Sequence, residues 1–215
     1  MASVTALDEI ASATLAHYDS NAQGFFEGTL DHDVSQNIGA LLNAITVPAP
    51  FTLLDLGCGP GRDLATFTKL GHHAIGLDGS AEFVAMARMY SGCTVWHQSF
   101  LHLDLPAAHF DGVYANASLF HVPRAALPMV LAQLCATLKE GGVLFSSNPR
   151  GDNQEGWSGE RYGSYHDYAA WKGYVEAAGF IEVEHYYRPP GVPREQQPWL
   201  ASVWRKLPHA VRMEW

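Results

Sequence analysis

Residues 51–67, FTLLDLGCGPGRDLATF, run from apolar residues through an aspartate and three glycines into a helix-like segment. A short apolar run before glycines is typical of a buried strand, and the residues after the turn are typical of a helix. In α/β proteins, a strand–turn–helix unit of this kind is a nucleotide-binding candidate. Three ligand classes compete for this turn: a dinucleotide, a nucleoside triphosphate, and a nucleoside without phosphates.

The residues around the glycines separate these ligands. A triphosphate loop requires a lysine after its glycines, and GCGPGRD has none. The dinucleotide fingerprint needs a glycine where this chain has Arg62, which weakens that interpretation but leaves it open. Asp55 precedes the glycines, where a carboxylate would repel pyrophosphate and suit an ammonium group, and Asp78 ends the next strand, where a carboxylate can bind both ribose hydroxyls. An amino acid joined to a nucleoside fits both, and S-adenosylmethionine is such a ligand.

The pattern of apolar residues predicts an alternation of strands and helices. Strands are expected at 51–56, 73–78, 94–98, 110–116, 143–148, 181–188 and 199–206, and helices at 6–18, 35–45, 61–71, 80–92, 123–142 and 167–180. Such alternation indicates an α/β fold with an open, mostly parallel sheet and helices on both faces. The segment PPGVPREQQP between the last two strands is too short for a parallel crossover, so the last strand is expected to be antiparallel.

Composition limits the function classes. The 215 residues are 47% apolar and 16% charged, enough for one well-buried core, with a net charge of −9. The sequence has no run of Lys and Arg, so a nucleic-acid partner is not expected. No segment is apolar enough to span a membrane, and no secretory signal is recognised. Three cysteines without CxxC spacing suggest reduced thiols and a cytoplasmic location, and the eleven histidines lack metal-ligand spacing, so no metal is expected.

Several motifs together resemble those of the class I S-adenosylmethionine-dependent methyltransferases. They are LLDLGCGPGRD, GLD, FDGVYANASLFHV and LKEGGVLF, and the resemblance covers about residues 51–206. It implies a Rossmann-like, doubly wound sheet of seven strands in a methyltransferase domain at 51–206. Residues 1–50 have no place in this sheet and contain aromatic and polar residues, so they are expected to form an N-terminal helical lid, and residues 207–215 a tail. The cofactor contacts that it implies are Asp55, Gly57, Cys58, Gly59, Arg62, Asp63, Asp78, Gly79, Ser99, Phe100, Asn116 and Ala117.

The resemblance assigns parts of the cofactor to these residues. Asp55 and the glycines, Gly61 included, would hold the methionine end, and Asp78 would hold the ribose. Where the family usually offers an aspartate to adenine, this chain has Gln98, Ser99 and Phe100. Family members that methylate nucleic-acid bases or protein glutamines carry a [DN]PP[YF] motif, and this chain has NASLF instead, so a small-molecule acceptor is expected.

Polar and aromatic residues near the expected strand ends form the candidate acceptor site. The catalytic candidates are Tyr18, Asn116 and His121; the substrate-binding candidates are Phe26, Asp33, Asn37, Phe120, Asn148, Arg150, Arg161, Tyr162 and Tyr165. His121 is either a general base or a capping residue. The two arginines suit a carboxylate-bearing acceptor, unless they pair with acids of their own loop.

The segment FFEGTLDHDVSQNIGALL resembles methyltransferases that act on histidine-derived thiols in ovothiol biosynthesis. An imidazole nitrogen of such a thiol is therefore the preferred acceptor. The alternatives are O-methylation of a small carboxylate or phenol, a non-catalytic cofactor-binding partner protein, and a dinucleotide oxidoreductase. The protein is expected to be a monomer or a homodimer.

Overall fold

The computed structural model describes residues 4–208, and most of the predicted tail lies outside this range. The elements are α1 (Val4–Ser20), α2 (Ala22–Thr29), α3 (Ser35–Ala44), β1 (Thr52–Leu56), α4 (Arg62–Lys69), β2 (His73–Asp78), α5 (Ala81–Ser91), β3 (Val95–His97), β4 (Phe110–Asn116), the 3-10 turn η1 (Leu119–His121), α6 (Leu127–Thr137), β5 (Leu138–Pro149), β6 (Gln154–Ser158), β7 (Arg161–Tyr165), α7 (Tyr168–Ala177), β8 (Phe180–Arg188), η2 (Arg194–Gln196) and β9 (Trp199–Lys206).

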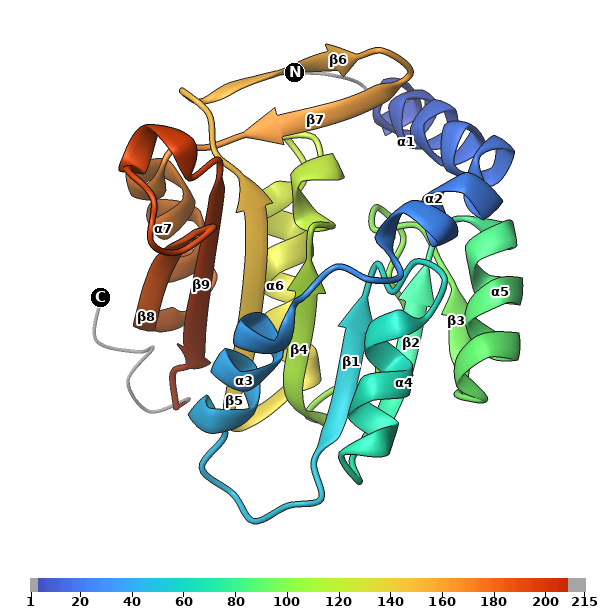
Figure 1. Cartoon of the computed structure of the whole chain (residues 1–215). Helices are drawn as coiled ribbons and strands as arrows, with labels where there is room; N and C mark the ends of the chain where they lie inside the picture. Colours follow the sequence, from blue (N-terminus) through green and yellow to red (C-terminus); the bar gives the residue numbers. More distant parts are fainter. Residues whose placement is uncertain (1–3, 209–215) are drawn as a thin grey trace.

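Seven strands form the central sheet in the order β3-β2-β1-β4-β5-β9-β8 (Figure 1). The strands from β3 to β5 pair in parallel, whereas β9 pairs antiparallel with both β5 and β8. The predicted α/β fold, with its antiparallel last strand, is therefore confirmed. Because β9 alone is reversed, β8 ends at the same edge of the sheet as β1, β2, β4 and β5.

Helices cover both faces of the sheet. Because side chains alternate along a strand, Leu53 of β1 faces α3 and α4, whereas Leu54 and Leu56 face α6 and α7. Figure 1 shows α3 and α4 in front of the sheet and α6 behind it. The core is thus two apolar layers, one on each side of the sheet.

Local signals set several boundaries correctly. The Ser80 hydroxyl accepts a hydrogen bond from the Phe83 backbone and caps α5, and Gly92 ends this helix in the left-handed conformation. The predicted end of α6 at residue 142 is wrong, because the helix stops at Thr137. Leu138 is extended and pairs with Phe110, so the following LKEGG segment begins β5 instead.

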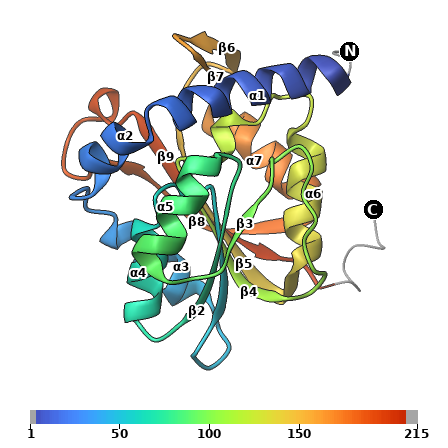
Figure 2. The same cartoon turned by 90° about the vertical axis from the view of Figure 1, so that its right-hand side faces the viewer.

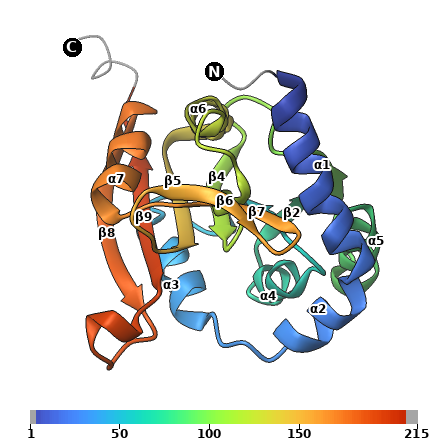
Figure 3. The ribbon, with the colours of Figure 1, turned by 90° about the horizontal axis from the view of Figure 1, so that it is seen from above.

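Two elements lie where loops were expected. The short helix α2 occupies part of the segment between the two predicted N-terminal helices, and the long segment after β5 forms the antiparallel hairpin β6–β7. Seen from above, this hairpin and α1 lie over the carboxyl edge of the sheet (Figure 3). Figure 2 shows α1 crossing the same edge from the side. The carboxyl edge is therefore covered by the N-terminal helix α1 and by the segment that follows β5.

Candidate functional site

A cavity of about 490 Å³ opens at the carboxyl edge of the sheet, within the 300–1,000 Å³ range of small-molecule sites. Its floor comes from the ends of β1, β2 and β4, and α1 and α2 contribute walls. The predicted site residues that line it are Tyr18, Asp33, Asn37, Gly57, Cys58, Gly59, Arg62, Asp63, Asp78, Gly79, Ser99, Phe100, Asn116, Ala117 and His121. The structure thus brings most of the predicted cofactor residues to one cavity.

The glycine turn after β1 forms one side of this cavity. Gly57, Gly59 and Gly61 all have positive φ angles, of 75°, 51° and 94°. A Cβ on Gly57 would lie 2.4 Å from the Cβ of Ser118, and a Cβ on Gly61 would lie 2.8 Å from the Cα of Ala87. The turn therefore needs glycine both for its conformation and for its close contact with β4's end and α5.

Asp78, at the end of β2, lies against the glycine turn. One carboxylate oxygen accepts a hydrogen bond from the Gly59 N–H at 2.9 Å, and the other accepts one from the Ser80 N–H at 2.9 Å. Burial raises the pKa of Asp78 to about 6, although these backbone N–H groups favour the ionised form. Each oxygen keeps acceptor capacity for a further hydroxyl group.

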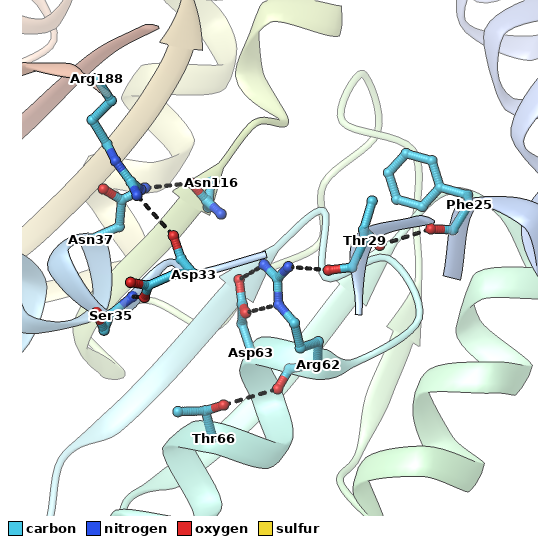
Figure 4. Close-up of polar contacts among 10 residues, drawn as sticks. All are labelled: Phe25, Thr29, Asp33, Ser35, Asn37, Arg62, Asp63, Thr66, Asn116 and Arg188. Carbon is cyan, nitrogen blue, oxygen red and sulfur yellow. Dashed lines mark hydrogen bonds and ion pairs between the residues drawn. The ribbon is translucent and has the colours of Figure 1, made fainter. Parts of the chain in front are cut away.

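Asp55 lies beneath the turn, outside the cavity lining. Its side chain is buried, and its Oδ2 has no hydrogen-bond partner among residues 4–208. Burial and the nearby Asp63 carboxylate raise its pKa well above the usual range. Asp63 is itself held by the guanidinium of Arg62, at 2.7 Å (Figure 4).

The loop after β3 supplies the wall where adenine was predicted. Ser99 and Phe100 line the cavity, and the Ser99 hydroxyl accepts a hydrogen bond from the Leu101 N–H at 3.3 Å. The Gln98 amide instead brackets the backbone of Asp104 and is absent from the lining. Of the two polar candidates, Ser99 is therefore the one that borders the cavity.

Two asparagines face each other at the other end of the cavity. The Asn37 amide of α3 donates to Oδ1 of Asn116, at the end of β4, at 2.9 Å (Figure 4). The Tyr186 hydroxyl of β8 donates to Oδ1 of Asn37, also at 2.9 Å. Ala117, directly after Asn116, has a φ angle of +58°, a conformation that is uncommon outside glycine and often found at functional sites.

Tyr18 and His121 form a second polar pair. The Tyr18 hydroxyl lies 2.7 Å from Nε2 of His121, and Nδ1 of His121 lies 2.7 Å from the carbonyl oxygen of Tyr162. A carbonyl oxygen only accepts, so Nδ1 carries the proton and Nε2 accepts from Tyr18. Burial lowers the pKa of His121 to about 4 and raises that of Tyr18, so both side chains are neutral at pH 7.

Several predicted substrate residues lie outside this cavity. Phe120, Arg161 and Tyr165 line a smaller neighbouring cavity of about 220 Å³, which shares His121 and Trp199 with the first. The other four predicted residues that line neither cavity are Phe26, Asn148, Arg150 and Tyr162.

Their contacts explain these positions. The Phe26 ring packs on Tyr90, and the Arg150 guanidinium lies over the Tyr187 ring, 5.4 Å from its centroid. Tyr162 reaches the site through its backbone, and Asn148 is buried without a side-chain partner in the described chain. Among residues 4–208, neither Arg150 nor Arg161 forms an ion pair with an acidic residue of its loop.

Sequence reasoning missed other lining residues. The most important are Arg188 at the end of β8 and Trp199 at the start of β9, which pair across the strands. No motif marks them, since their place depends on where the last two strands pack. Within residues 4–208 no three His, Cys, Asp or Glu side chains gather as metal ligands, and no helix of this range is long and apolar enough to cross a membrane.

Comparisons with known proteins agree with this geometry. Residues 53–142 match a family model described as a methyltransferase domain. A trans-aconitate 2-methyltransferase of Azoarcus sp. (strain BH72) is 36% identical over 112 residues, which are 51% of this chain and 44% of that protein. A ubiquinone biosynthesis O-methyltransferase of Paraburkholderia phytofirmans is 35% identical over 103 residues, 45% and 43% of the two chains. The matched part therefore spans less than half of these relatives.

Solved structures share the fold over nearly the whole chain. The Burkholderia thailandensis 1,6-didemethyltoxoflavin-N1-methyltransferase, solved with 1,6-didemethyltoxoflavin and S-adenosylhomocysteine, has a TM-score of 0.75 at 22% identity and covers 97% of this chain and 93% of its own. A DhpI–S-adenosylhomocysteine complex has a TM-score of 0.68 at 17% identity, covering 93% and 98%. The fold is that of the class I methyltransferases, as the sequence motifs predicted.

Proposed function

We propose that this chain, with its methyltransferase domain at residues 53–142, transfers a methyl group from S-adenosylmethionine to an oxygen atom of a small-molecule acceptor. One observation carries the proposal. A single cavity joins Asp78 and the glycine turn to the polar pairs Tyr18–His121 and Asn37–Asn116. A methyl donor and an acceptor can therefore meet in one cavity.

The residues present suit the cofactor. The two oxygens of Asp78 have free acceptor capacity for the ribose hydroxyls, and Phe100 offers an apolar face to adenine beside Ser99. The glycine turn leaves room for the methionine part. Asp55, predicted to hold the methionine end, is buried beneath the turn and outside the cavity lining, and its Oδ2 lacks a partner in residues 4–208. When bound, the cofactor supplies a methyl group activated by its positively charged sulfur.

The acceptor side works by orientation. In-line displacement requires the nucleophile, the methyl carbon and the sulfur to be aligned and kept from water. Asn116 borders the cavity at the end of β4, with Asn37 fixing its amide. We assign Asn116 to positioning the reacting atom, and Asp33 and Asn37 to the acceptor's wall. The helices of residues 1–50 would close the cavity as a lid.

The state of His121 favours an acceptor that arrives ionised. With a pKa of about 4, this imidazole can accept a hydrogen bond from Tyr18 but holds a proton weakly at pH 7. A carboxylate acceptor needs no deprotonation, whereas a phenol does. The relatives' names, a trans-aconitate methyltransferase and an O-methyltransferase, also favour oxygen.

The imidazole nitrogen of a histidine-derived thiol stays as the second candidate. A neutral imidazole also has a nitrogen lone pair that needs orientation and no strong base, and the polar wall of Asp33, Asn37 and Tyr18 suits it. A first test measures S-adenosylhomocysteine formation from S-adenosylmethionine with carboxylates, phenols and imidazole amino acids. Turnover of imidazoles alone would reverse the order of the two candidates.

Binding measurements separate the remaining alternatives. Isothermal titration with S-adenosylhomocysteine and with NADH should give binding of the first only; binding of NADH alone would contradict the proposal. Binding without turnover of any acceptor would favour a non-catalytic partner protein. The three cysteines are free, which suits the cytoplasmic location that we also propose, and the acceptor is not a nucleic acid, in keeping with the net charge of −9.

A further inference from the structure

Arg188 ends β8 at the carboxyl edge of the sheet and lines the cavity. It pairs in register with Trp199 of β9, which in turn pairs with Pro149 of β5. Its guanidinium donates a hydrogen bond to the carbonyl oxygen of Asp33, at 2.8 Å, and thus reaches from the last strands to the segment before α3 (Figure 4). A positive charge therefore borders the acceptor half of the cavity.

The two arginines in the cavity lining, Arg62 and Arg188, differ in how many hydrogen bonds their guanidinium groups form. Arg62 engages all three nitrogens of its guanidinium: Nε and Nη2 donate to the Asp63 carboxylate, at 2.7 and 3.1 Å, and Nη1 donates to the carbonyl oxygen of Thr29, at 2.6 Å. Arg188 has only the Asp33 carbonyl, and no carboxylate of residues 4–208 lies within 4.0 Å of it. An arginine has five N–H donors, so Arg188 keeps donors that a ligand can use.

A neutral donor lies at the same end of the cavity. Burial raises the pKa of Tyr186, so its hydroxyl keeps its proton and donates to Oδ1 of Asn37. This bond directs the Asn37 amide nitrogen to Oδ1 of Asn116. The Asn116 amide nitrogen then has no partner in the described chain and borders the cavity as a donor. Donors without acceptors are what an anionic group requires.

The one acid on this part of the wall is Asp33. Its side chain is exposed, and hydrogen bonds from Ser35 lower its pKa, so it is ionised at neutral pH. Its charge lies at the solvent side, where water screens it. This charge should weaken anion binding slightly. Removing it should therefore change the affinity for an anion in the opposite direction from removing the charge of Arg188.

We propose that Arg188 binds a carboxylate of the methyl acceptor, separate from the acceptor's reacting atom. This inference rests on the function proposed above and narrows its acceptor to small molecules with an additional carboxylate. The reacting atom cannot be the group held by Arg188, because a guanidinium that engages a carboxylate's lone pairs weakens it as a nucleophile. Its planar fork makes Arg188 a specificity-determining residue, since lysine cannot form the same paired hydrogen bonds.

The test uses trans-aconitate, which has three carboxylates, and its neutral trimethyl ester as probes. Both are titrated by calorimetry into the full-length protein, with and without saturating S-adenosylhomocysteine. The variants are Arg188→Gln, Arg188→Lys and Asp33→Asn. The matched control is Arg194→Gln, which removes the same charge from a side chain that lies over Tyr187, outside the cavity.

We expect Arg188→Gln to raise the Kd for trans-aconitate at least about tenfold and Arg188→Lys to raise it by a smaller factor, because charge-assisted hydrogen bonds are lost. Asp33→Asn, which removes a negative charge from the acceptor's wall, should lower the Kd, and Arg194→Gln should match the wild type. All variants should keep the wild-type Kd for S-adenosylhomocysteine, which also shows that they fold.

Three results would overturn the assignment: no trans-aconitate binding by the wild type, equal Kd values for wild type and Arg188→Gln, or tighter binding of the triester than of the acid. Failure of the wild type to bind S-adenosylhomocysteine is a different outcome, and it would count against the proposed function itself.

Discussion

Asp78 should make cofactor affinity depend on pH between 5 and 7. Burial raises its pKa to about 6 in the free protein, and the ionised carboxylate is the form that accepts hydrogen bonds from ribose hydroxyls. Protonation therefore competes with binding. For one proton at this pKa, the apparent Kd for S-adenosylhomocysteine is multiplied by about 1.1 at pH 7, about 2 at pH 6 and about 11 at pH 5.

The assay is calorimetric titration of S-adenosylhomocysteine at constant ionic strength from pH 5 to 7.5, for the wild type and Asp78→Asn. The amide cannot titrate, so the variant should bind more weakly at pH 7, by about 1–3 kcal/mol, with a flatter pH dependence. Asp55 also has a raised pKa, but it contributes to both curves, so their difference isolates Asp78. A wild-type Kd that is constant over this range, or equal slopes for both proteins, would refute the reasoning.

Three further perturbations test other parts of the site. Tyr18→Phe should lower kcat about tenfold for a carboxylate acceptor, with little change in cofactor Kd, because it removes a hydroxyl from the cavity wall while a carboxylate has no proton to lose. Steady-state rates check this, and a loss of a hundredfold or more would contradict it. Gly57→Ala should abolish S-adenosylhomocysteine binding, because the added Cβ would lie 2.4 Å from the Cβ of Ser118. Gly71 also has a positive φ angle but has open space around it, so Gly71→Ala should only lower the free energy of unfolding by about 1–2 kcal/mol. Calorimetry and thermal melting compare the two, and similar binding would count against the turn's role. Removal of residues 1–34 should abolish turnover because α1 and α2 wall the cavity, and retained methyl release in this truncation would rule out the lid.

The cofactor half of the site could be predicted because its signals are local. The residues from Leu53 to Arg62 contain strand, glycine turn and helix within a few positions. The three glycines of this turn all have positive φ angles, which favour glycine. Asp78 could be predicted from a local signal too, because it ends the next strand, β2. A sheet with parallel strands brings such strand ends to one edge, so the fold and this part of the site follow together.

The acceptor half could not be predicted in the same way. The sequence suggested Arg150 and Arg161, whereas the cavity contains Arg188, because the direction of a side chain at a strand end depends on packing between distant strands. The hairpin β6–β7 gave no signal either. β6 is mostly exposed, each of the two strands has a glycine at its centre, and neither shows the apolar alternation that marks a strand.

The family model ends at residue 142, and the residues at the cofactor end of the cavity, from Gly57 to Ala117, lie inside it. Asp33, Asn37, Arg188 and the hairpin lie outside it, in the segments that cover the carboxyl edge. Similarity to a trans-aconitate or ubiquinone enzyme over less than half of its length therefore supports the methyl donor more strongly than the acceptor. The acceptor has to be inferred from the segments of this chain outside residues 53–142, and the free donors of Arg188 at that end of the cavity favour an anion.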